Sequence, residues 1–207
     1  MKDMERKNAY ANIFGFLAGL TNSLSIIIMG VFTTHVTGAA TNAGRYLGSL
    51  NVSLFELYIG LFFFFIIGSF FATILMAKKG FPVPILFAGA LLIAAGVLTP
   101  PKIQPGSTDQ FIFGFLVAVA MGAQNASTGL TPIGRTTHIT GATTEFGISL
   151  GRMDKKNLVR LGSFILSFIA GTFTAFFLQA TIGPRGFILV GVSLLLVAFF
   201  LRKFGPK

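Results

Sequence analysis

The chain contains uncharged apolar stretches about as long as a lipid bilayer is thick, and these stretches restrict the folds open to it. A hydrocarbon core of about 30 Å requires roughly 20 apolar residues per helix. The six segments that meet or approach this length are residues 11–32, 57–77, 81–99, 111–130, 161–180 and 186–201. The composition agrees, since 53% of the residues are hydrophobic and only 11% are charged. We therefore expect an all-α membrane protein with six transmembrane helices.

The formal net charge of +10 would suggest a nucleic-acid partner in a soluble protein. Here the basic residues lie in short segments between apolar runs, so we interpret them as topology signals and expect no nucleic acid. With six spans and a cytoplasmic N-terminus, the basic residues divide 13 inside to 3 outside, the three being Arg45, Lys102 and Arg185. An eight-span alternative, in which residues 38–50 and 141–153 cross the membrane, divides them 12 to 4 and places Lys78 and Lys79 outside.

The N-terminal region has a second interpretation. A basic start followed by an apolar run is also typical of a signal peptide, with TGAA at residues 37–40 as a cleavage site. The same pattern recurs in the middle of the chain, where no cleavage is expected, and this favours a transmembrane span. The chain has no cysteine, which excludes disulfides, thiolate metal sites and cysteine catalysis.

A polar motif occurs twice, each time at the end of an apolar run. Residues 33–44 read TTHVTGAATNAG and residues 136–147 read TTHITGATTEFG, with 8 of 12 positions identical. The register of 103 residues continues without a gap from residue 19 to residue 80, and it aligns Gly19 with Gly122 and Asn22 with Asn125. This pattern predicts an internal duplication, with residues 1–103 and 104–207 as two three-span repeats of a single membrane domain.

An odd number of spans in each repeat places the second repeat upside down relative to the first. The charges agree, because residues 33–57 contain a single basic residue, whereas residues 136–160 contain Arg152, Lys155, Lys156 and Arg160. The sequence therefore predicts two inverted three-helix repeats.

The segments 33–50 and 136–151 are too polar to cross lipid alone and are rich in residues that cap or break helices. We expect broken or re-entrant helices after spans 1 and 4, with an irregular link over residues 33–38 and a short helix that Thr37 caps. Half-helix N-termini of this kind suit an anion or a polar solute. Two GxxxG pairs, Gly44 with Gly48 and Gly147 with Gly151, predict close packing of the short helices against neighbours.

The candidate substrate-binding residues come from the two motifs and the polar positions just before them. They are Asn22, Thr34, His35, Thr37, Gly38, Gln124, Asn125, Thr137, His138, Thr140 and Gly141. Threonine hydroxyls would donate hydrogen bonds, the asparagines would orient the solute, and the histidines would supply switchable charge. The alternative is architectural: the hydroxyls bond back to the helix, His satisfies a carbonyl and Gly permits packing.

Glu145 has Asn42 as its counterpart, so an acidic group is present on one side only. Together with His35 and His138 it is a candidate proton carrier, and the alternative is a partner for Arg135 or Arg152. Two histidines without cysteine or paired carboxylates form a weak metal-ligand set, so we expect no metal and no other cofactor. An enzyme is not expected, because the chain has no H-E-x-x-H, no G-x-S-x-G and no carboxylate pair within the spans.

The stretches GLTNSLSIIIMGVFTTHVTGAATNAG and AMGAQNASTGLTPIGRTTHITGATTEFG resemble the YoaK-type family of bacterial integral membrane proteins, whose function is unknown. The resemblance covers nearly the whole chain and implies a six-span protein of the inner membrane.

Taken together, these features favour a secondary transporter or permease for a small polar or anionic solute, with its site near the bilayer midplane between the repeats. A channel and a non-transporting membrane scaffold or assembly factor are the alternatives. The expected partners are the lipid bilayer and a small-molecule solute, with a homodimer left open. The expected location is the bacterial cytoplasmic membrane, with both termini in the cytoplasm.

Overall fold

The computed structural model describes residues 2–204, and every regular element in that range is helical. Its α-helices are α1 (Lys2–Met29), α2 (Val36–Gly48), α3 (Val52–Lys79), α4 (Pro82–Leu98), α5 (Thr108–Gly129), α6 (Ile139–Gly151), α7 (Lys155–Ile182) and α8 (Gly186–Phe204). The 3-10 helix η1 (Gly183–Arg185) connects α7 to α8. The predicted all-α fold is confirmed, and each predicted apolar segment coincides largely with one helix.

Four stretches of the described chain are long and apolar enough to cross a membrane. They are Met4–Met29, Val52–Lys79, Thr108–Gly129 and Lys155–Leu201, and the last of these includes both α7 and α8. Helix α4 is also apolar but has only 17 residues. The long apolar helices that the composition predicts are therefore present.

Local chemistry accounts for several helix boundaries. The side chain of Asn51 accepts a hydrogen bond from the Leu54 N–H at 3.2 Å at the start of α3, and Asp154 does the same for the Asn157 N–H at 3.2 Å at the start of α7. Pro82 occupies the first turn of α4, where its missing N–H is not needed. Gly80 ends α3 with a φ of 85°, which a glycine adopts without strain.

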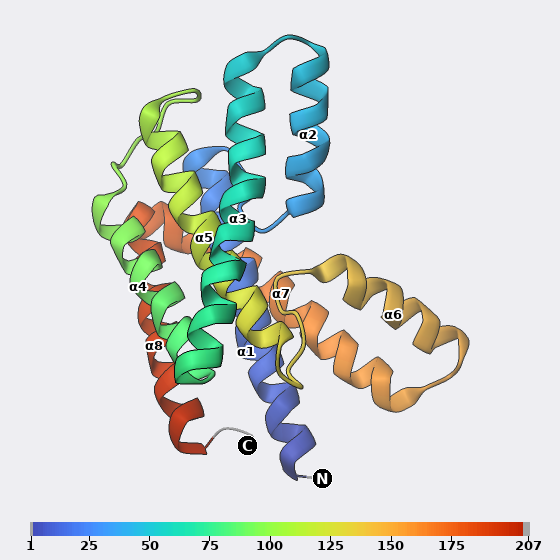
Figure 1. Cartoon of the computed structure of the whole chain (residues 1–207). Helices are drawn as coiled ribbons and strands as arrows, with labels where there is room; N and C mark the ends of the chain where they lie inside the picture. Colours follow the sequence, from blue (N-terminus) through green and yellow to red (C-terminus); the bar gives the residue numbers. More distant parts are fainter. Residues whose placement is uncertain (1, 205–207) are drawn as a thin grey trace.

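The long helices pack in pairs that join the two halves of the chain. Helix α1 packs along α7, α3 packs along α5, and α4 packs along α8. Within the described residues, the backbone of α1 approaches α5, α7 and α8 but no helix of residues 1–103. Figure 1 shows α1 and α5 in the middle of the bundle, with α4 and α8 on one side.

Glycines allow these helices to cross at close range. A Cβ atom at Gly19 or Gly122 would clash with the carbonyl oxygen of Phe168 or Phe65 on the facing helix. Gly68 and Gly171 are placed in the same way against the carbonyl oxygens of Val119 and Phe16. Since the obstacle is backbone in each case, a side chain could enter only if the helices moved apart.

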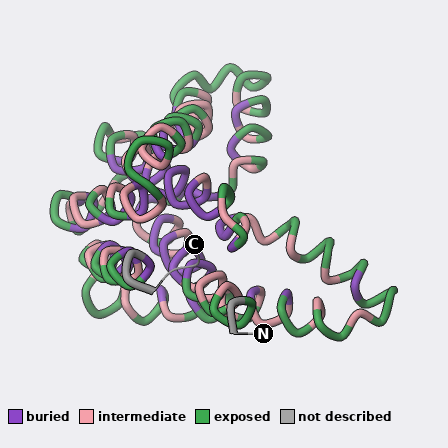
Figure 2. Tube along the Cα trace, turned by 60° about the horizontal axis from the view of Figure 1, so that its bottom comes forward, coloured by how far each residue is buried: buried purple, intermediate pink, exposed green. Residues whose placement is uncertain are grey.

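Two helical arms extend from this bundle. The first arm consists of α2 and the adjoining N-terminal part of α3, and the second consists of α6 and the adjoining N-terminal part of α7 (Figure 1). Ala39 and Ala43 are the buried residues of α2, and Ser149 is the buried residue of α6. Figure 2 shows this contrast, with burial concentrated in the central helices and mostly exposed or half-buried residues along the second arm.

Two local predictions are wrong. Thr37 does not cap the first short helix, because α2 begins at Val36 and its N-cap residue is His35. Among the described residues of this chain, the GxxxG pairs do not mediate close packing, since a Cβ atom at Gly44, Gly48, Gly147 or Gly151 would meet nothing within 4 Å. The physical reason is that α2 turns Ala39 and Ala43 towards the protein, which leaves its glycines on the outside.

The helix boundaries repeat along the chain. The bounds of α2 and α6 differ by 103 residues at both ends, and so do the bounds of α3 and α7. The same spacing separates Leu50 from Met153, two non-glycine residues with positive φ angles of 56° and 54° in the turns that follow α2 and α6. The register found in the sequence is therefore also a register of local structure.

Candidate functional site

Two asparagines fix the links that precede the short helices, which are residues 30–35 before α2 and residues 130–138 before α6. The Asn22 side-chain oxygen accepts a hydrogen bond from the Thr34 N–H at 3.3 Å, and the Asn125 side-chain oxygen accepts one from the Thr137 N–H at 3.4 Å. Buried irregular backbone needs such partners because no water satisfies it. Asn22 and Asn125 thus hold the backbone of the two links in place.

Hydroxyl pairs add a second connection in each link. Ser25 and Thr33 share a hydrogen bond of 3.0 Å, and Thr128 and Thr136 share one of 3.1 Å. All four residues are buried. These contacts lie 103 residues apart, as do the asparagine contacts, so both links are built in the same way.

Gln124 brings a further polar group into the core. Its Nε2 atom donates to the Phe14 carbonyl oxygen at 3.2 Å and lies 3.5 Å from Thr136 Oγ1. Its Oε1 atom has no hydrogen-bond partner among the described residues, and neither has Thr137 Oγ1, although both atoms are buried. Unpaired buried acceptors are rare in proteins. The core beside the second link therefore retains polar groups that local structure does not use.

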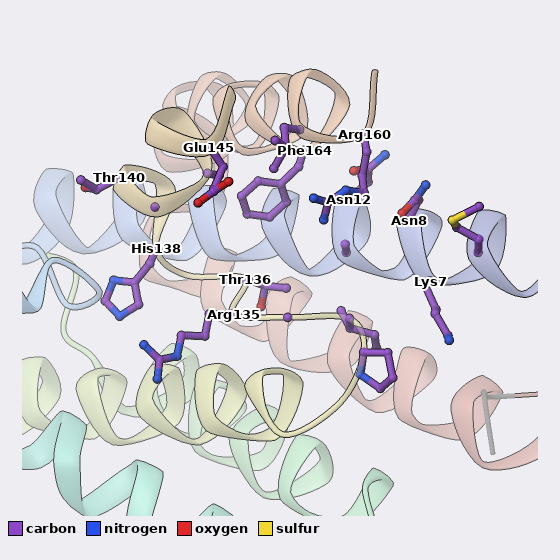
Figure 3. A pocket seen from close by; sticks show the side chains of 18 of the residues that line it. Lys7, Asn8, Asn12, Arg135, Thr136, His138, Thr140, Glu145, Arg160 and Phe164 are labelled. Carbon is purple, nitrogen blue, oxygen red and sulfur yellow. The ribbon is translucent and has the colours of Figure 1, made fainter. Parts of the chain in front are cut away.

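A cavity of about 880 Å³ lies between α1, the link before α6, α6 itself and the start of α7. The N-terminal end of α2 also contributes to its wall through His35 and Thr37. Figure 3 shows Lys7, Asn8 and Asn12 on α1, with Glu145 on α6 and Arg160 and Phe164 on α7. The cavity is thus formed by residues from both halves of the chain.

The two histidines lie at equivalent helix starts, and both line the cavity. His35 is the N-cap residue of α2 and His138 is the N-cap residue of α6. Thr37 and Thr140, which follow them by two residues, also line the cavity. The cavity is consequently bounded by two pairs of residues that correspond in the 103-residue register.

Half of the predicted site residues line this cavity. They are His35, Thr37, His138, Thr140, Gly141 and the proton-carrier candidate Glu145. The others lie elsewhere: Asn22, Thr34, Gln124, Asn125 and Thr137 belong to the links and the core behind them, and Gly38 lies under the ring of His35. Thr136, which the prediction did not include, connects the cavity wall to Gln124.

Several lining residues were missed by the sequence reasoning. From the sequence, Lys7 and Arg160 are predicted only as topology signals, Arg135 is also an alternative partner for Glu145, and Asn8 and Asn12 carry no prediction. Asn8 and Asn12 are four residues apart and therefore share one face of α1. This spacing in the sequence indicates a shared polar face on the first helix. Asn12 also bonds to Ser163 on α7 at 3.2 Å, a contact that spans 151 residues and has no local signature.

His138 is half-buried and lies outside the four apolar stretches. Removal from water lowers the pKa of His138 below its ordinary value, and the positive charge of Arg135 and the nearby His35 lower it further. His138 is therefore neutral near pH 7 and gains its charge only in more acidic conditions. Among the described residues, no cluster of three His, Asp or Glu side chains could hold a metal ion.

Comparisons with known proteins identify a family without a known activity. No curated protein and no solved structure matches the chain. Residues 11–201 match the family described as a protein of unknown function, DUF1275. Because the match covers nearly the whole length, including both motifs and the cavity residues from Ala11 onward, the chain belongs to the DUF1275 family.

Proposed function

We propose that this protein is a secondary transporter or permease for a small polar or anionic solute, built from two inverted repeats. The observation that carries this proposal is the cavity between the halves, which both histidines and both helix-start threonines line. In alternating access, the two repeats move around a fixed binding site, so equivalent residues of both repeats should line that site.

Alternating access also requires that, in any one state, one of two equivalent regions is open and the other is closed. Lys7, Asn12 and Pro132 line the open cavity, and their counterparts at a spacing of 103 residues are Gln110, Phe115 and Met29. Gln110 Nε2 donates to the Met29 carbonyl oxygen at 2.6 Å, and Phe115 stacks on Phe64 with 4.5 Å between ring centroids. The counterpart region is therefore closed by direct contacts. In our proposal, the opposite state opens this region and closes the cavity.

We further propose six spans in a bacterial cytoplasmic membrane, with both termini inside. Support comes from Figure 1, in which the N-terminal end of α1, the C-terminal end of α8 and the turn between α3 and α4 lie at the same end of the bundle. The turn between α2 and α3 lies at the opposite end. This arrangement groups Lys7 with Lys78 and Lys79 and separates them from Arg45, which agrees with the positive-inside rule.

The first test uses the natural absence of cysteine in the chain. Ala142→Cys places a thiol in the cavity wall, and Ala39→Cys places one at the equivalent position of the first repeat, where Ala39 is only 5% exposed. We expect a membrane-impermeant thiol reagent to label Ala142→Cys from the cytoplasmic side and to label Ala39→Cys slowly, from the opposite side. A transported solute should change the two labelling rates in opposite directions.

Other outcomes would contradict the transporter proposal. Equal and simultaneous labelling of both positions from opposite sides would indicate a continuous pore, and therefore a channel. Failure to label Ala142→Cys from either side would show that the cavity is not a path for solutes and would favour a scaffold. Uptake of candidate solutes by proteoliposomes is the matching functional assay.

A further inference from the structure

The charged side chains around the cavity make it positive. Lys7 from α1, Arg135 from the link and Arg160 from α7 line it, and Glu145 is the acidic residue among the described lining residues. Arg135, Glu145 and Arg160 are exposed, so their charges act on anything that enters. A concave surface lined mainly by one sign of charge concentrates ions of the opposite sign.

Backbone groups add to this positive character. The side chain of neither His35 nor His138 accepts a hydrogen bond from the first turn of its own helix. The first-turn residues Thr37, Thr140 and Gly141 line the cavity. The first N–H groups of a helix lack partners within the helix, and the helix dipole favours a negative charge beside them. Two such helix starts meet at the same cavity as the three basic side chains.

The basic residues of the cavity wall have uncharged counterparts in the other repeat. In the 103-residue register, Lys7, Arg135 and Arg160 correspond to Gln110, Phe32 and Leu57, all of which are uncharged. The residues that line the cavity as equivalent pairs are instead the histidines and the helix-start threonines. The equivalent region of the other repeat therefore lacks this basic lining.

Part of the cavity wall is apolar. Ile133, Leu161 and Phe164 line it together with the polar groups, and each of these three residues is at least nine-tenths buried. A solute that fits this wall has an uncharged, apolar portion beside its charged group. Inorganic ions alone would leave this apolar surface without a contact.

From these observations, and resting on the transport function proposed above, we propose that the cavity binds a small organic oxyanion, which is a carboxylate or phosphate attached to an apolar group. The anion enters from the face at which α1 begins, where Lys7 and Arg160 attract it, and moves towards Arg135, which lies beside His138 (Figure 3). The apolar portion contacts Phe164 and its neighbours.

The charge selectivity of the cavity can be measured without knowing the natural solute. The purified full chain carrying Ala142→Cys is treated with an anionic and a cationic methanethiosulfonate reagent of similar size, and the ratio of their rates is determined. Thr143→Cys is the matched control, because Thr143 is exposed on the same helix and does not line the cavity. We expect the ratio at residue 142 to exceed the ratio at residue 143 by about tenfold at low salt and to fall as salt screens the charges.

Two further arms identify the residues and the ligand. Arg135→Gln with Arg160→Gln should remove most of the anion preference, whereas Arg160→Lys should retain it, and thermal melting shows whether each variant is folded. Benzoate or phenyl phosphate should slow the labelling of Ala142→Cys, and benzylamine should not. Protection by only one of the two anions would identify the preferred charged group.

The inference is overturned if the cationic reagent reacts as fast as the anionic one, if the folded double arginine variant keeps the preference, or if benzylamine protects as well as benzoate. These outcomes are separate from a failure of transport. Anion preference without uptake of any organic anion would refute the transport proposal, while uptake of cations or neutral solutes without anion preference would refute this inference.

Discussion

The two histidines illustrate how position decides what equivalent residues can do. His35 and His138 occupy the same place in their repeats, yet His35 is exposed and His138 is half-buried beside Arg135. The counterpart of Arg135 is Phe32, whose ring meets His35 edge-on with 6.0 Å between centroids. Together with the different burial of the two histidines, the presence of Arg135 in place of phenylalanine makes the two sites unequal.

This environment leads to a pH prediction. Because burial and Arg135 lower the pKa of His138, the residue is mostly neutral at pH 7 and gains its positive charge at a more acidic pH than an ordinary histidine does. Lys7, Arg160 and His35 also face the cavity and disfavour that charge, and Glu145 favours it. We expect the anion preference at Ala142→Cys to increase as the pH falls from 7.5 to 5.5. Each change of about 1.4 kcal/mol in the interaction of a singly charged reagent with the cavity would change the rate of that reagent roughly tenfold.

His138→Gln should make this pH profile nearly flat. His35→Gln is the matched control at the equivalent position, and since His35 is exposed its charge is better screened, so the profile should largely persist. The measurement is the ratio of the two reagent rates at each pH. A profile that survives in His138→Gln would show that another group titrates in the cavity.

At the scale of helices, glycine has opposite roles in different elements. Gly19 and Gly171 lie where α1 and α7 cross, and Gly44 and Gly147 lie on the open faces of α2 and α6. The sequence cannot separate these two roles, because all four glycines belong to the same repeated register of small residues.

Alanine substitution should separate them. Gly19→Ala and Gly171→Ala place a methyl group against backbone carbonyl oxygens of the facing helix, and overpacking of this kind costs about 1–3 kcal/mol. Gly44→Ala and Gly147→Ala, the matched controls, meet open space and should gain up to about 1 kcal/mol of helix propensity. Thermal unfolding in detergent checks both. Equal effects at all four positions would contradict the assigned crossing points.

Much of the helical organisation follows from the sequence, and particular residues show where that ends. The register predicted from Asn22 with Asn125 and from the two motifs recurs in the bounds of α2 and α6. The predicted start of α2 is too late in the chain, and the link before it is held by a hydrogen bond from the Thr34 N–H to Asn22, twelve residues away, which no local pattern encodes. The contribution of Lys7 and Arg160 to one cavity depends on the packing of α1 against α7, which no local pattern encodes.

At the scale of the whole molecule, the proposed topology has a direct test. Lys79→Cys and Lys102→Cys place single exposed thiols at the end of α3 and after α4. With six spans, we expect an impermeant reagent to label Lys79→Cys only from the cytoplasmic side and Lys102→Cys only from the opposite side. The eight-span alternative predicts that Lys79→Cys is labelled from outside, so this one position distinguishes the two.

The packing of α1 also has a consequence for biosynthesis. When the ribosome has completed residues 1–103, α1 has met none of the helices that it contacts in the finished molecule, because α5, α7 and α8 all follow later. The surface of α1 around Gly19 therefore has no packing partner in the nascent chain until α7 has been synthesised. The first half expressed alone should therefore fold poorly. Two halves expressed as separate chains should accumulate only when the same cell produces both.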